Sequence, residues 1–170
     1  MRPIVASLLS GLLALTARGF VLTSPEESAH TYLHARAAFG PTLAPSTAGR
    51  VVWAKPRDAC EPVSNAAQVR SAIALVMRSA PGAARRCDFA AKVRALQRAG
   101  AKLVVVVNHD GEDGIDDANK LVTMTAMDAA KDIKVPAIFV VSCVTLLDSH
   151  VARASSLGDV PRAAELSCRS

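Results

Sequence analysis

Aromatic residues are scarce in this chain of 170 residues, which holds four Phe, one Trp and one Tyr. Hydrophobic residues nevertheless make up 51% of the sequence, so we expect a core of Val, Leu, Ile and Ala. A chain of this length can bury such a core as one domain, without help from a metal or an oligomer. A long apolar run is also lacking. The apolar stretch 4–17 is too short to cross a bilayer, since a spanning helix needs about 20 apolar residues.

The N-terminus has the layout of a secretory signal peptide. Arg2 precedes the apolar stretch, and the small residues Ala17 and Gly19 follow it, which is the order of regions in such peptides. We predict a signal peptide at residues 1–19, an N-terminal lead-in at 20–34 and the folded domain at 35–170; a buried N-terminal helix is the alternative. The predicted location is outside the cell or in the lumen of the endomembrane system, vacuole and lysosome included, with no membrane attachment after cleavage. N-glycosylation is not expected, because the sequence has no Asn-x-Ser/Thr sequon.

Neither sign of charge dominates the chain, whose formal net charge is +5, or +3 without Arg2 and Arg18. This is too little to indicate a nucleic-acid partner. The charges are unevenly distributed, since residues 50–102 hold eleven Lys or Arg against three acidic residues. Residues 108–132 hold seven acidic residues against two lysines. We therefore expect a basic face and an acidic loop.

An even number of cysteines indicates disulfides in an oxidising compartment. The four can form three pairings, and their spacing matches no zinc site: Cys60, Cys87, Cys143 and Cys168. We favour Cys60–Cys87 with Cys143–Cys168 as a hypothesis. Each bond would close a loop of about 27 residues and contribute about 3–4 kcal/mol in the chain-entropy model.

Signatures of catalysis and of metal binding are absent or incomplete. The chain has no Gly-x-Ser-x-Gly and no Gly-x-Gly-x-x-Gly, so we predict that it is not an enzyme and has no cofactor. His30 and His34 have the spacing of a helical zinc pair but lack the Glu of His-Glu-x-x-His. The acidic segment 108–119 fails the EF-hand template, with Asp113 in place of Gly and Asn119 in place of Glu. We predict no metal, and keep a looser calcium site in this segment as an alternative to a solvated loop.

Strand and helix patterns predict a mixed α/β fold. Apolar runs predict strands at 50–54, 73–77, 103–107 and 136–141, with a further strand within 32–39. The helical period after Asp88, ending at Gly100, predicts a helix with Lys92 exposed on its first turn. Strand–helix–strand order predicts parallel pairing. A last helix capped by Ser142 and a short strand near 165–168 complete the expected elements.

An ordered series of motifs runs through residues 73–141. It comprises the strand Ile-Ala-Leu-Val-Met, then Cys87-Asp-Phe89-Ala-Ala-Lys92, a helix ending Ala-Gly-Ala101, an aliphatic strand ending at Asn108, and a Val-Pro-led strand. This series resembles the protease-associated (PA) domain family, whose pattern includes an Arg-Gly-x-Cys-x-Phe-x-x-Lys turn. The likeness extends upstream to Ala38-Phe-Gly-Pro41, Lys55-Pro and Asp58-Ala-Cys. It covers roughly residues 35–150.

The resemblance implies a swivelling β/β/α fold, a mixed sheet with two or three helices, and a non-catalytic role in binding protein or peptide. The chain departs from the family at the Arg-Gly-x-Cys turn, which is expanded by residues 79–86. We predict the binding surfaces on loops, namely Arg85 and Arg86 on the expanded loop, and Asp110, Glu112, Asp113, Asp116 and Asp117 on the acidic loop.

Two alternative functions accompany this prediction. The first is an accessory domain of a larger subtilisin-like or zinc peptidase or of a sorting receptor. The second is the binding of acidic glycan by a basic face comprising Arg78, Arg85, Arg86, Arg94 and Arg98. The sequence gives no indication of the oligomeric state.

Overall fold

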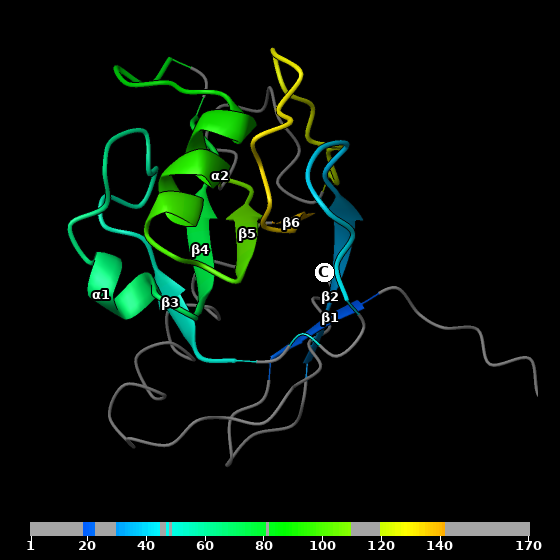
Figure 1. The fold of residues 1–170 in the computed structure, drawn as a ribbon. Helices are drawn as coiled ribbons and strands as arrows, with labels where there is room; N and C mark the ends of the chain where they lie inside the picture. The colour runs from blue at the N-terminus through cyan, green and yellow to red at the C-terminus, as the bar shows by residue number, and fades with distance from the viewer. Residues whose placement is uncertain are drawn as a thin grey trace, which may run out of the picture.

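A mixed β-sheet with two helices on one face makes up the described part of the chain (Figure 1). In this computed structural model the described residues are 19–22, 30–44, 47, 49–80, 82–109 and 120–141. The strands are β1 Gly19–Leu22, β2 His30–Arg36, β3 Val51–Trp53, β4 Ile73–Met77, β5 Leu103–Val107 and β6 Ala137–Val140. The helices are α1 Ala66–Val69 and α2 Phe89–Arg98. The strand order is β1-β2-β6-β5-β4-β3.

Strands β3, β4, β5 and β6 are parallel, whereas β2 pairs with β6, and β1 with β2, in the antiparallel direction. The predicted parallel pairing of residues 73–77 with 103–107 is confirmed over all five positions. Every residue of β5 is buried, as expected of a β-branched strand covered on both faces. The mixed sheet and the α/β class are confirmed.

Helix α2 begins and ends as its sequence predicts. The Asp88 side chain caps it by accepting a hydrogen bond from the Ala91 backbone N–H at 2.7 Å. Gly100 follows the helix with φ at +85°, a conformation that glycine adopts without steric cost. The chain can therefore turn directly from α2 into β5.

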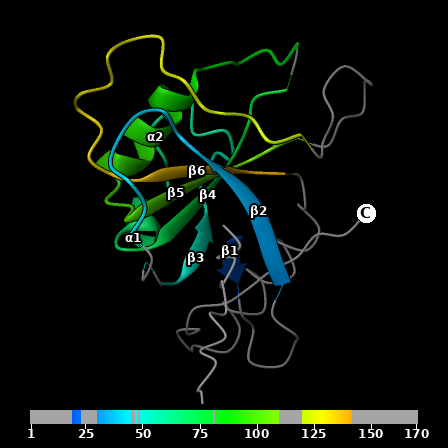
Figure 2. The same ribbon diagram turned by 90° about the vertical axis from the view of Figure 1, so that its right-hand side faces the viewer.

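The two faces of the sheet carry separate groups of buried side chains. One group lies between the sheet and α2 and includes Val93, Leu96 and Phe139; Phe89 packs its ring edge-to-face on Phe139, with centroids 6.1 Å apart. The other group includes Leu75 and Val105 on the opposite face. Figure 2 shows both helices on the same side of the sheet.

Element boundaries differ from the prediction by only a few residues. The strand predicted within 32–39 is β2, which begins at His30, and those at 50–54 and 136–141 are shorter. Neither β1 nor α1 was predicted. The predicted signal peptide up to residue 18, the helix after Ser142 and the strand near 165–168 lie outside the described residues. Neither helix in the described ranges is long and apolar enough to cross a membrane.

Candidate functional site

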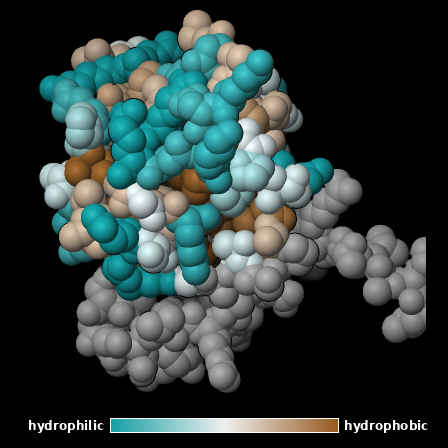
Figure 3. Space-filling model, viewed as in Figure 1, coloured by the Kyte–Doolittle hydropathy of each residue, from teal (hydrophilic) through white to brown (hydrophobic). Residues whose placement is uncertain are grey.

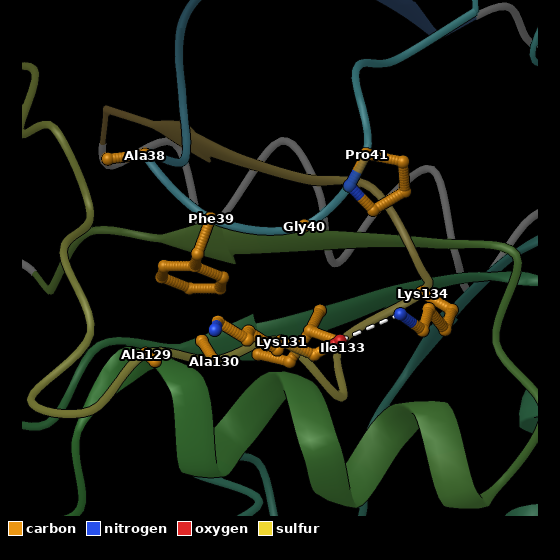
Figure 4. A pocket seen from close by; sticks show the side chains of 9 residues that line it. All are labelled: Ala38, Phe39, Gly40, Pro41, Ala129, Ala130, Lys131, Ile133 and Lys134. Carbon is orange, nitrogen blue, oxygen red and sulfur yellow. Dashed lines mark hydrogen bonds between the residues drawn. The ribbon is translucent and has the colours of Figure 1, made fainter.

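An open groove lies between the loop that follows β2 and the segment that precedes β6 (Figure 4). Its volume is about 410 Å³, within the range of about 300–1,000 Å³ that is common for ligand pockets. One wall is formed by residues 38–41, and the other by residues 129–131, 133 and 134. The two walls are far apart in sequence and meet because β2 pairs with β6.

The two walls approach each other closely at Gly40, where there is no room for a side chain. Gly40 has φ at +72°, and a Cβ atom there would lie 3.0 Å from the Val135 carbonyl oxygen and 3.1 Å from Ile133 Cγ2. Just before it, the Ala38 N–H donates to the Met124 carbonyl at 2.9 Å. A side chain at position 40 would therefore push the walls apart.

Helix α2 holds the second wall through one arginine and one glutamine. The Arg94 guanidinium donates to both carboxylate oxygens of Asp132 at 2.7 and 2.8 Å, and to Asp128 at 2.8 Å. The Gln97 side chain donates to the Asp132 carbonyl at 3.0 Å and accepts from the Val135 N–H at 3.2 Å. Hydrogen bonds from Arg94 lower the pKa of Asp132 to about 2. This wall is thus attached to the most regular helix of the fold.

The groove surface combines apolar side chains with two cations. Phe39 points from the first wall toward the second, where Lys131 and Lys134 lie (Figure 4). The Lys134 ammonium donates to the Lys131 carbonyl at 2.7 Å, which fixes one of the two charges near the groove. Such a surface can bind an apolar group and an anion together.

A disulfide and a buried lysine attach the start of α2 to the segment 58–60. Cys60 and Cys87 are bonded with Cα atoms 5.5 Å apart, so this predicted pairing is confirmed; Cys143 and Cys168 lie outside the described residues. The Lys92 ammonium donates to the Asp58 carbonyl at 2.6 Å and lies 3.5 Å from Cys60 Sγ.

The prediction that Lys92 is exposed is wrong, because the residue is fully buried. Lys92 follows Phe89 by three positions and precedes Leu96 by four, a spacing that places it on the inner face of the helix. Burial lowers its pKa, and the nearby Asp58 charge partly opposes this effect. The helical spacing was the signal that could have placed Lys92 correctly.

Comparison with family models matches residues 46–143 to the PA domain. This range covers more than half of the chain. The chain belongs to the PA domain family. A search of curated proteins finds no significant match. The predicted resemblance is confirmed, and the matched range ends just after β6 of this PA domain.

The expanded loop of this PA domain presents Arg85 and Arg86 to solvent. Arg85 pairs with Glu61 at 2.5 Å, next to the Cys60–Cys87 bond that closes the base of the loop. The rest of the predicted site lies outside the described residues: Asp110, Glu112, Asp113, Asp116 and Asp117. The structure therefore places only the basic half of the predicted surfaces, and the groove is a site that the sequence did not predict.

The histidines that suggested a zinc pair lie in a strand of the PA domain. His30 and His34 both belong to β2, where positions four apart are separated by about 13 Å, whereas zinc ligands lie about 2 Å from the metal. No group of three or more His, Cys, Asp or Glu residues is arranged to hold a metal within the described ranges.

At the carboxyl ends of β4 and β5, the Arg78 guanidinium donates to Asn108 Oδ1 at 3.2 Å.

Proposed function

We propose that this PA domain is a non-catalytic module that binds protein or peptide segments in the secretory pathway or outside the cell. The observation that carries the proposal is the open groove of about 410 Å³ whose two walls are fixed to the sheet and to α2. Domains of this family are generally non-catalytic accessory domains. The Cys60–Cys87 disulfide fits a secreted or lumenal protein.

An open groove between two fixed walls suits a segment of extended chain. An enclosed pocket surrounds most of a small ligand, whereas this groove is open along its surface. Its walls are held before any ligand arrives, so binding would cost little ordering of the domain itself. This geometry favours short linear segments of a partner.

The binding of acidic glycan is less well supported by the contacts of the arginines that would carry it. Arg94 is engaged by Asp128 and Asp132, and Arg85 by Glu61. A sulfated or carboxylated glycan would have to displace these carboxylates. The accessory-domain alternative is compatible with the proposal, since a groove of this kind would serve a larger host in the same way.

The proposal is tested by panning a displayed peptide library against the purified chain and measuring the enriched peptides by fluorescence anisotropy. Ala129 is an exposed wall residue, so Ala129→Trp should fill the groove and abolish binding. Ala67→Trp, at an exposed position of α1, is the matched control and should bind normally. If binding is lost in Ala84→Trp and not in Ala129→Trp, the binding site is on the expanded loop and not in the groove. Failure to enrich any peptide would refute the proposal.

A further inference from the structure

The formal charges that line the groove have one sign. Among its lining residues are Lys131 and Lys134, both exposed, and within the described residues no Asp or Glu is among them. A cationic peptide would be repelled at this surface, and an anionic one attracted. The effect operates within the Debye length, about 8 Å at physiological salt.

The acidic residues of the same segment face the helix and not the groove. Asp128 and Asp132 flank Lys131, but both carboxylates accept hydrogen bonds from Arg94 on α2. Their pKa values are lowered by these bonds, so both remain ionised and paired at neutral pH. In this segment the two carboxylates therefore contact the helix, whereas the lysine between them lines the groove.

Apolar side chains are exposed in the groove and close to it along the chain. Phe39 is half-buried in one wall, and Met127, two residues before the wall residue Ala129, is 92% exposed. On the face drawn in Figure 3, hydrophobic patches lie between the hydrophilic clusters. Exposed methionines are common on surfaces that bind varied apolar side chains.

We propose that the groove binds a peptide segment in which an apolar side chain is adjacent to a carboxylate. The apolar side chain packs on Phe39, and the carboxylate pairs with Lys131. This inference rests on the proposed function, because it names the class of peptide that the same groove takes. The expanded loop does not line this groove, so neither Arg85 nor Arg86 takes part.

The test uses four labelled peptides of equal length, measured by fluorescence anisotropy with the full chain. Their central motifs are Glu-Leu-Glu, Gln-Leu-Gln, Lys-Leu-Lys and Glu-Ala-Glu. The acidic leucine peptide should bind about two- to fivefold more tightly than the neutral one for each lysine it contacts, and the alanine peptide should bind more weakly because it buries less apolar surface. The acidic preference should shrink at high salt.

Charge reversal at one lysine gives the decisive comparison. Lys131→Glu should abolish or invert the preference for the acidic peptide, whereas Lys55→Glu, at an exposed site away from the groove, should retain it. Circular dichroism should show that both variants remain folded.

Each other outcome overturns the inference. Equal binding of acidic and neutral peptides, both lost in Ala129→Trp, would refute it and leave the proposed function standing. Acidic binding that survives Lys131→Glu and Ala129→Trp would place the anion site elsewhere. If none of the four peptides binds, the inference is wrong, and the library experiment decides the proposed function separately.

Discussion

Replacement of Gly40 by alanine provides a direct test of how the groove is built. Gly40 and Gly82 have nearly the same positive φ, +72° and +76°. A Cβ at position 82 would meet nothing within 4 Å, whereas one at position 40 would lie 3.0 Å from the Val135 carbonyl oxygen. The two substitutions therefore share the backbone strain and differ in the contact.

The difference between the two variants isolates the contact energy. The left-handed conformation costs a residue with a Cβ about 1–2 kcal/mol, and the loss of glycine's freedom in the unfolded chain returns about 0.4–1 kcal/mol. Both terms apply equally to Gly40→Ala and Gly82→Ala. The overlap with backbone at position 40 adds about 1–3 kcal/mol, the usual cost of overpacking. Gly40→Ala should thus lower the free energy of unfolding by about 1–3 kcal/mol more than Gly82→Ala.

Equilibrium unfolding in urea, monitored by circular dichroism, gives both free energies by linear extrapolation. The m-values of the two variants should match that of the unsubstituted protein, because the surface exposed on unfolding does not change. Peptide binding should weaken in Gly40→Ala and remain normal in Gly82→Ala. Equal destabilisation of the two variants would refute the close approach of Gly40 to the 133–135 backbone.

Three further predictions concern the disulfide, Lys92 and the Arg94 ion pairs. The double variant Cys60→Ser/Cys87→Ser opens a link between residues 27 apart, and denaturant titration should show a loss of about 3.5 kcal/mol; a loss under about 1 kcal/mol would contradict the loop-entropy account. The pKa of Lys92 is lower in the folded protein than its ordinary value of 10.5. At pH values between the folded-state pKa and 10.5, the unfolded chain therefore binds one more proton than the folded chain. The stability of the unsubstituted protein relative to Lys92→Met should therefore rise with pH in that window, and a flat difference in denaturant titrations would count against a buried ammonium. Since the pKa of Asp132 is lowered from 3.8 to about 2, its pair with Arg94 stabilises the fold fully above the unfolded value, and this contribution is lost as pH falls through about 2. Acid unfolding followed by circular dichroism should show this dependence in the unsubstituted protein and not in Arg94→Gln.

The central strands and α2 could be predicted from the sequence because their signals are local. The run of valines in β5, the cap at Asp88 and the turn at Gly100 each depend on residues that are neighbours along the chain. Their agreement with the family motifs strengthened the prediction. The short helix α1 was missed because four residues are too few to show a helical period.

The environment of Lys92 was missed for a different reason. A lysine in a helix is ordinarily solvated, and its hydrogen-bond partner is a backbone carbonyl, that of Asp58, which has no sequence signature. Only the helical spacing placed it inward.

The groove could not be predicted from the sequence because its walls meet through strand order. Nothing in residues 38–41 or 129–134 indicates that β2 pairs with β6 rather than with β3. Gly40 carried a signal, since a glycine between bulky neighbours often marks close backbone approach, but the partner of that approach is set by tertiary structure.

The place of β2 in the sheet also bears on the order in which the molecule assembles. Strands β3, β4 and β5 are near one another in sequence, whereas His34 of β2 pairs with Val140 of β6 across most of the domain. Contacts of such long sequence separation carry a large loop-closure entropy and form slowly. We therefore expect β2 to join late, after the parallel unit has formed on α2. The groove depends on this last closure, so it exists only in chains whose sheet is complete.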